Sequence, residues 1–431
     1  MTVPNQSSPI PLPQRIRYYI FLRDVLTLAL TAFGGPQAHL AHFHKVLVAR
    51  RRYLTEEELM ELNSLCQILP GPASTQTLTA VGFKIGGPNL AYLTLLVWIT
   101  PAVLAMTAAA ILMSSLQTKN LSLEFTRFIQ PIAVGFVSYG AYAISIKTIS
   151  SKTGIAIMMM AALVSYFIQS PFVFPFILLI AGLVTALKYK KQPKDQEKKK
   201  LVISWSNFLL WVGVLVFAAV LGAVTKALPV KLFENFYRNG SLVFGGGQVL
   251  APLLYTEFVD VERESPTDAS KAAEFKNKLK TRYSPKKYHH PISHNEFLSG
   301  YAFAQALPGP VFSFSAYIGA LSARDYGIAG SILGAFMSAI GIFLPGTFLI
   351  FFVIRFWSSL KKYRGVRASL EGITAASAGL VAASAIILFQ PLENTILNFS
   401  TTIITFCILA FTRIPSPFII IGGLILGLVL K

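Results

Sequence analysis

The chain has 431 residues, of which 54% are hydrophobic and only 13% are charged, whereas a soluble protein carries about 25% charged residues. This composition excludes an ordinary soluble domain and indicates a membrane protein. The net charge is +19, which in a soluble protein would suggest a nucleic-acid partner. Here the basic residues lie at the ends of apolar segments and in loops, as the positive-inside rule predicts. We therefore expect a lipid bilayer around the chain and no nucleic acid.

Uncharged segments recur along the whole chain, and all but the last two reach the roughly 20 residues that a helix needs to cross a bilayer core. One of them carries Pro171 and Pro175 near its middle, so we expect two short helices in a hairpin there. The sequence predicts an all-α polytopic membrane protein with nine full crossings and four re-entrant hairpins. The uncharged segments are 88–116, 128–146, 153–187, 205–225, 326–354, 372–392, 395–412 and 414–430.

A lysine-rich stretch divides the chain into two parts. We predict a first repeat at 1–187, a basic cytoplasmic linker at 188–204 and a second repeat at 205–431, which contains a polar loop insertion at about 257–295. The polar N-terminus has no signal-peptide pattern. We expect the N-terminus to lie in the cytoplasm and the protein to lie in the plasma membrane.

Loop charge predicts that the two repeats are inverted with respect to each other. The loop at 117–127 is weakly charged and should lie outside the cell. Its counterpart at 355–367 is strongly basic and should lie inside. Corresponding loops on opposite faces are typical of transporters built from inverted repeats.

A short proline- and glycine-rich phrase occurs twice, as QILPGP at 67–72 and QALPGP at 305–310. Each copy follows a glycine cluster, FGGPQ at 33–37 or FGGGQ at 244–248. Such residues at a hairpin tip leave backbone groups unpaired, which a membrane tolerates only where protein or a water-filled cavity surrounds the tip. The alternative is that they merely kink helices and allow close packing. Two copies at matched positions favour broken helices that meet at a site.

Half-helices that begin at these tips would direct free N–H groups and positive dipole ends into a cavity. Pro36 and Pro72 suit their first turns. A cation site would need carboxylates or exposed carbonyls, and no acidic residue lies between 66 and 82 or between 297 and 321. We therefore predict an oxyanion site. The candidate substrate-binding residues are Gly34, Gly35, Pro36, Gln37, His39, Gln67, Pro70, Gly71, Pro72, Ser74, Thr75, Gln76, Gly245, Gly246, Gln248, Gln305, Pro308, Gly309, Pro310, Ser313 and Ser315.

Four further features near the first motif have competing interpretations. His39 is the histidine nearest the tip and is a candidate for handling substrate or protons. Lys84 either extends toward the membrane surface or lines a vestibule. Thr55 is expected to cap a solvated first turn of acidic residues. The arginine triplet 50–52 is first a determinant of topology and second an attractor of anions.

At these motifs the chain resembles a known family. FGGPQAHL at 33–40, RRRYLTEEEL at 50–59 and LCQILPGPASTQ at 65–76 resemble the first-half signature of the chromate ion transporter family. LVFGGGQVLAPLL at 242–254 and AFAQALPGPVFSFSAYIG at 302–319 resemble its second-half signature. The resemblance implies a long two-domain member that moves chromate, often as efflux that confers resistance. Sulfate is a related ligand, because both are tetrahedral dianions of similar size.

The leading hypothesis is a secondary transporter of tetrahedral oxyanions. The sequence has no GxxxxGK[ST] phosphate-binding loop, so we do not expect this chain to be driven by ATP. An anion channel could use the same site. An intramembrane enzyme would need a nucleophile with a base or a metal motif such as HExxH, and neither pattern occurs. No metal and no cofactor is expected, and a homodimer is the expected assembly.

Overall fold

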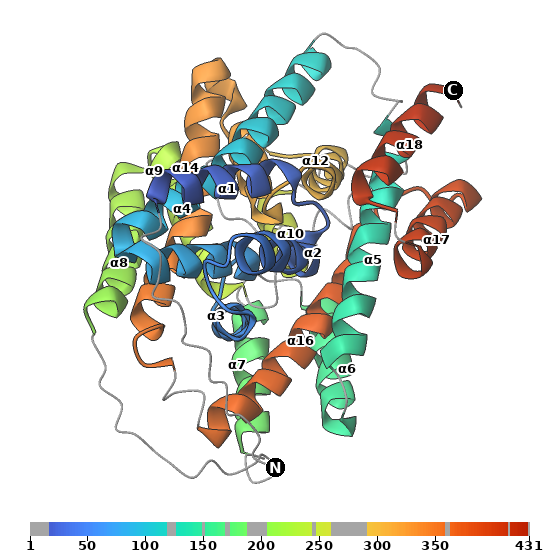
Figure 1. Cartoon of the computed structure of the whole chain (residues 1–431). Helices are drawn as coiled ribbons and strands as arrows, with labels where there is room; N and C mark the ends of the chain where they lie inside the picture. The colour runs from blue at the N-terminus through green and yellow to red at the C-terminus, as the bar shows by residue number, and fades with distance from the viewer. Residues whose placement is uncertain are drawn as a thin grey trace, which may run out of the picture.

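The structure, a computed structural model, is helical throughout the part of the chain that it describes (Figure 1). The described residues are 17–118, 126–148, 151–168, 173–187, 205–243, 247–259, 291–357, 363–412 and 414–429. The predicted linker 188–204 and most of the polar insertion lie outside them.

The helices form two series with one helix between them. The first series is α1 (Tyr18–Thr31), α2 (Gly35–Phe43) with the π-helical turn η1 (His44–Arg50), α3 (Glu56–Ile68), α4 (Ala73–Thr118), α5 (Ile129–Thr148), α6 (Lys152–Phe167) and α7 (Val173–Ala186). Helix α8 (Ser206–Thr225) follows. The second series is α9 (Leu228–Leu242), α10 (Gly247–Phe258), α12 (His294–Ala306), η5 (Val311–Ser313), α13 (Phe314–Ser322), η6 (Arg324–Tyr326), α14 (Gly327–Val353), α16 (Arg364–Phe389), α17 (Ile396–Phe411) and α18 (Ser416–Val429).

The helix that leads to each PGP motif begins with the same local device. Thr55 accepts a hydrogen bond from the backbone N–H of Glu58, and the Glu58 carboxylate accepts one from the backbone N–H of Thr55, at 3.2 and 2.9 Å. Ser293 and Glu296 form the same reciprocal pair at the start of α12. Such capping boxes satisfy two N–H groups that have no partner inside the helix. The predicted Thr55 cap is therefore confirmed.

The helix that leaves each PGP motif is broken at a glycine with the same backbone conformation. In α4 the break lies at Gly87, with φ 73° and ψ −164°. In the second series Gly327 has φ 71° and ψ −165°, and it caps η6 and begins α14. Positive φ is readily adopted only by glycine. Three residues before each break a basic side chain, Lys84 or Arg324, pairs with the glutamate of the capping box, Glu58 or Glu296. The two series therefore repeat one structural plan, which confirms the predicted internal duplication.

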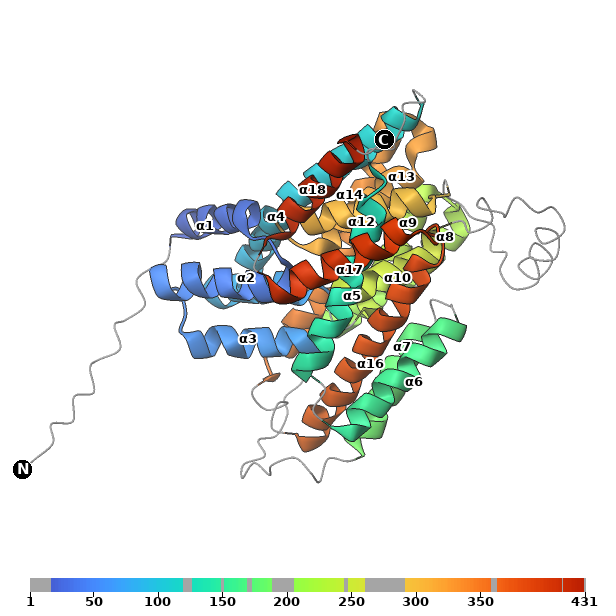
Figure 2. The ribbon, with the colours of Figure 1, turned by 90° about the vertical axis from the view of Figure 1, so that its right-hand side faces the viewer.

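The C-terminal hairpin of each series packs on the other series. Helices α6 and α7 lie against α16, and α17 and α18 lie against α5 (Figure 2). Gln390, the C-cap of α16, donates to the hydroxyl of Tyr166 in α6 at 2.9 Å. Thr402 of α17 donates to the carbonyl oxygen of Pro131 in α5 at 3.1 Å. The exchange makes the two repeats one interlocked unit rather than two separate domains.

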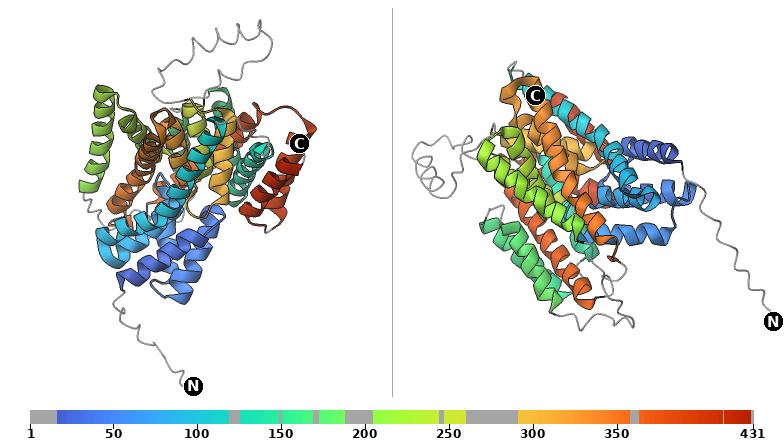
Figure 3. Two further views of the ribbon diagram at one scale, coloured as in Figure 1. Left: turned by 90° about the horizontal axis from the view of Figure 1, so that it is seen from above. Right: turned by 90° about the vertical axis from the view of Figure 1, so that its left-hand side faces the viewer.

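Five described helices are long and apolar enough to cross a membrane: α4, α5, α8, α14 and α16. Of these, α14 is the most buried, with 72% of its apolar window inside the protein, against 11% for α8. Helix α8 lies at one edge and the C-terminal helices lie at the opposite edge (Figure 3). We therefore place α14 in the protein core and α8 against lipid.

The remaining predicted crossings are shorter. Helices α6, α7, α17 and α18 have 16, 14, 16 and 14 residues. At about 1.5 Å per residue each spans roughly 21–24 Å, which is less than the hydrocarbon core of about 30 Å. The hairpin predicted within 153–187 is confirmed as two short helices, α6 and α7, with Pro175 in the first turn of α7, but helix length supports only five of the nine predicted full crossings.

Candidate functional site

The two PGP tips are docked across the boundary between the repeats. The backbone N–H of Gly71 donates to the carbonyl oxygen of Val243 at 2.7 Å, and that of Gly309 donates to the carbonyl oxygen of Ala32 at 2.9 Å. Val243 and Ala32 each directly precede the glycine cluster of their own repeat. The tip glycines have φ of +112° and +101°, a conformation that side chains with a Cβ rarely adopt. Each tip is therefore hydrogen-bonded to the residue that precedes the glycine cluster of the other repeat.

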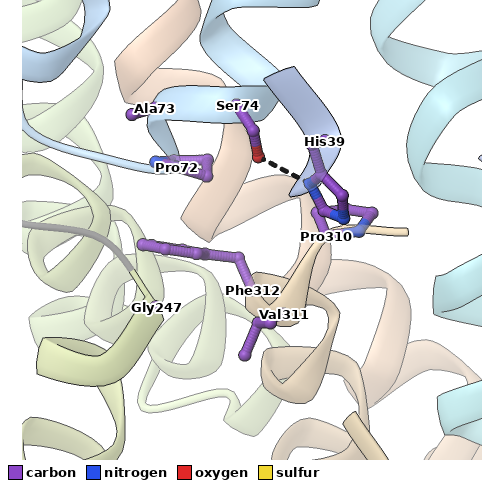
Figure 4. Close-up of a pocket in the computed structure, with 8 residues that line it drawn as sticks. All are labelled: His39, Pro72, Ala73, Ser74, Gly247, Pro310, Val311 and Phe312. Atoms are coloured by element: carbon purple, nitrogen blue, oxygen red, sulfur yellow. Dashed lines mark hydrogen bonds between the residues drawn. The ribbon is translucent and has the colours of Figure 1, made fainter. Parts of the chain in front are cut away.

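A small cavity lies where these four segments meet (Figure 4). Each PGP motif contributes its last proline and the next two residues, which are Pro72, Ala73 and Ser74 in one copy and Pro310, Val311 and Phe312 in the other. The other two lining residues are His39, in α2 just after the first glycine cluster, and Gly247, which is the last glycine of the second cluster and the first residue of α10. The convergence of all four segments is the arrangement that the sequence predicts.

His39 is the most polar side chain in the lining, and it is only 1% exposed. Its Nδ1 forms a 3.1 Å hydrogen bond with the hydroxyl of Ser74 (Figure 4). Its Nε2 is buried and has no hydrogen-bond partner. The ring meets Trp98 edge to face, with centroids 5.4 Å apart, and Trp98 donates to the hydroxyl of Thr75 at 3.1 Å. These contacts hold the imidazole in one orientation at the cavity.

Helix beginnings supply further donors at the same place. Helix α4 makes its first backbone bond from Gln76 to the carbonyl of Pro72, so the N–H groups of residues 73–75 have no acceptor within the helix. In the second copy the first bond runs from Ser313 to Pro310, which leaves the N–H groups of residues 311 and 312 in the same situation. These groups and the helix dipoles favour a negative charge. None of the eight lining residues carries a permanent charge.

Several predicted residues support the tips from behind rather than line the cavity. Thr75 and Gln76 are each 2% exposed; Thr75 accepts the Trp98 bond, and the Gln76 amide donates to the carbonyl oxygen of Pro70 at 2.6 Å. The Gln305 amide donates to the hydroxyl of Tyr301 at 2.9 Å. Gly71 and Gly309 make the docking bonds. These five residues therefore maintain the shape of the site through side-chain or backbone hydrogen bonds.

The other predicted residues lie around it. Gln67 is exposed at the end of α3, and Pro308 is half-buried. Ser313 and Ser315 are buried but do not line the cavity. In the first glycine cluster, Gly34 caps α2 with φ +91°, and Gly35 and Pro36 are the first residues of that helix. Gln37 and Gln248 lie in the first turns of α2 and α10, and their side chains are not described. Gly245 and Gly246 lie outside the described residues. Of the predicted set, the cavity brings together His39, Pro72, Ser74 and Pro310.

Sequence reasoning missed Phe312, Val311, Ala73, Gly247 and Trp98. For the first three a signal existed, because PGPAS and PGPVF place Ala73 with Val311 and Ser74 with Phe312. Aligning the two copies would have identified both pairs. Trp98 lies 23 residues beyond Thr75, on the far side of the helix break, and only the folded chain brings it to the site.

Basic residues near the first motif are paired away from the cavity. Arg51 donates to the carboxylate of Asp24 at 2.8 Å, and Tyr53 donates to the same carboxylate at 2.7 Å. Lys84 lies 2.6 Å from the Glu58 carboxylate, and its hydrogen bond lowers the pKa of that carboxyl group. Neither Arg51 nor Lys84 lines the cavity. The lining residues that the structure describes therefore favour an anion through backbone dipoles rather than through a fixed charge.

An internally duplicated, multi-pass helical protein whose broken helices meet at a cavity has the architecture of a membrane transporter. The family model described as chromate transporter matches residues 20–186 and 282–428. The chain therefore belongs to the chromate transporter family.

Named relatives from three organisms are similar over most of the chain. A chromate transport protein of Cupriavidus metallidurans is 23% identical over 94% of this chain and 91% of its own length. A chromate transport protein of Pseudomonas aeruginosa is 23% identical over 87% of this chain and 84% of its own length. An uncharacterized transporter of Methanocaldococcus jannaschii is 24% identical over 78% of this chain and 75% of its own length. No solved structure shows significant similarity to the chain.

Proposed function

We propose that this protein is a secondary transporter of tetrahedral oxyanions that exports chromate across the plasma membrane and also accepts sulfate. The observation that carries the proposal is the cavity formed by the same three positions of both PGP copies, with the unpartnered Nε2 of His39 at its wall. Oxyanion oxygens would accept from the free N–H groups at residues 73–75, 311 and 312 and from the polar pair of His39 and Ser74. None of the eight lining residues that the structure describes is a carboxylate, which supports an anion rather than a cation.

The channel hypothesis uses the same cavity, and coupled flux separates it from a transporter. A channel would pass labelled sulfate only down its gradient. A secondary transporter would accumulate it against a gradient when a second ion or an opposing anion gradient is imposed. The assay is uptake of labelled chromate and sulfate by proteoliposomes that contain the full chain.

Sulfate should compete with chromate, whereas nitrate should compete weakly. A site of N–H dipoles and hydroxyls recognises charge and tetrahedral shape, and a flat monoanion matches neither. Replacing Ser74 with alanine removes a lining donor worth about 1 kcal/mol, so we expect roughly fivefold weaker inhibition by sulfate. Ser64→Ala is the matched control, because that hydroxyl is exposed and bonds to the carbonyl of Met60. Strong inhibition of chromate uptake by nitrate with none by sulfate would contradict the tetrahedral-dianion site.

The repeats are expected to be inverted, with the N-terminus in the cytoplasm. In a variant without Cys66 and Cys407, single cysteines at Ser122 and Ser358 should label from opposite faces of the cell, the first from outside and the second from inside. Both positions lie in the predicted loops, outside the described residues. Labelling of both from one face would refute the inversion. A homodimer remains our expected assembly, to be measured by mass in detergent.

A further inference from the structure

The buried pair of His39 and Ser74 contains too few protons to serve a dianion well when the imidazole is neutral. The two side chains lie 3.1 Å apart in a hydrogen bond, and the Nε2 of His39 has no other partner. A neutral ring brings one N–H and Ser74 brings one O–H. One of these two protons is used in the mutual bond, so the pair offers a single donor to the cavity.

Protonation of the imidazole raises the number of hydrogen-bond donors that the pair offers to the cavity from one to two. Its Nδ1–H donates to the oxygen of Ser74, which frees the hydroxyl proton for a ligand, and its Nε2–H faces the ligand as a second donor. The ring also brings a positive charge. Hydrogen bonds between charged groups are roughly twice as strong as neutral ones. Among the eight lining residues that the structure describes, there is no Lys or Arg that could supply this charge instead.

We propose that His39 takes up one proton together with the oxyanion and that the two cross the membrane together. The inference rests on the proposed oxyanion transport and adds its coupling ion. The proton binds Nε2 or Nδ1 on the loading side and leaves from the same ring on the release side, so no bond to the anion forms or breaks. A dianion with one proton carries a net charge of −1. An interior-negative membrane potential therefore still favours export, by about 2.3 kcal/mol per 100 mV.

Burial lowers the pKa of the His39 imidazole, so the ring gains its proton together with the negative charge of the anion rather than before it. On its own helix His42 is the other titratable group that acts on the ring. On the elements packed nearby, Asp24 is paired with Arg51 and Glu58 with Lys84.

The test measures protons and sulfate in one preparation. Proteoliposomes that contain the full chain and a trapped pH-sensitive dye receive an inward gradient of labelled sulfate. Sulfate is the informative ligand because it stays a dianion near neutral pH and cannot carry the proton itself. We expect wild-type protein to acidify the lumen in a constant ratio to sulfate entry. With one proton linked, the apparent affinity for sulfate should fall by up to about tenfold per unit of rising pH.

His39→Gln keeps a polar side chain of similar reach but cannot be protonated. We expect its slower sulfate entry to bring no protons and to lose the pH dependence. His42→Gln, on the same helix, should keep the wild-type ratio. Ser74→Ala should weaken sulfate binding but keep the wild-type ratio of protons to sulfate. This second variant keeps the proposal testable if the His39 variant does not fold.

Three results would overturn the coupling. They are sulfate entry without acidification in wild-type protein, an unchanged proton-to-sulfate ratio in His39→Gln, and loss of the ratio in His42→Gln with its retention in His39→Gln. The proposed transport itself fails in a different way, because wild-type protein would then move neither labelled anion and no proton would follow its addition.

Discussion

Replacing both tip glycines with valine should abolish chromate uptake while the protein remains inserted in the membrane. Gly71 and Gly309 have φ above +100°, where a β-branched residue is strongly disfavoured. A Cβ at Gly71 would lie 2.7 Å from the side-chain nitrogen Nε2 of Gln76, and one at Gly309 would lie 3.0 Å from the Cβ of Ala102. The valines would therefore push both tips off Val243 and Ala32 and open the cavity. We expect the double variant to lose at least about 99% of uptake, which corresponds to roughly 3 kcal/mol.

The measurement is initial uptake of labelled chromate per amount of inserted protein, with each single variant beside the double variant. Gly213→Val is the matched control, because a Cβ at that position in α8 meets no atom within 4 Å. It should transport at the wild-type rate. Full activity in the Gly71→Val, Gly309→Val variant would remove the docked tips from the mechanism.

Neither repeat should be stable without the other, but the two should assemble when they are produced together. Separation within 188–204 would leave α5 without α17 and α18, and α16 without α6 and α7. Each half would expose helix faces that are apolar and shaped for protein rather than lipid. Each PGP tip would also lose its acceptor, Val243 or Ala32. A buried backbone N–H without a partner costs about 1–3 kcal/mol.

The experiment expresses the halves alone and together and measures their amount in the membrane and chromate uptake. Each half alone should be several-fold less abundant than the joined chain, because unfolded membrane protein is degraded. The co-expressed halves should recover uptake and purify as one complex through a tag on either. If a single half accumulated normally and transported chromate, the interlocked architecture would not be required for function.

Much of this protein is already decided by local sequence. Long uncharged segments can be stable only as helices in lipid, so composition alone identifies the class of fold. The capping box at Thr55 depends on residues three apart, and the helix break at Gly87 depends on a glycine that can adopt positive φ. The two PGP copies indicate duplication because nearly the same residues occur in the same order in both. These features involve neighbours in the chain, and a pattern can therefore predict them.

Only the tertiary structure decided which side chains face the cavity and which hold it in shape. Thr75 and Ser74 are adjacent in sequence, yet Ser74 lines the cavity with His39 while Thr75 turns to Trp98. The exchange of hairpins and the docking of each tip on the other repeat join residues that are far apart in sequence, as in the bond from Gly309 to Ala32. Such contacts arise because packed helices bring together segments whose separation in sequence carries no information about their distance in space. The charge pattern of the loops could likewise suggest which basic residues attract anions, but the pairing of Arg51 with Asp24 is a matter of geometry.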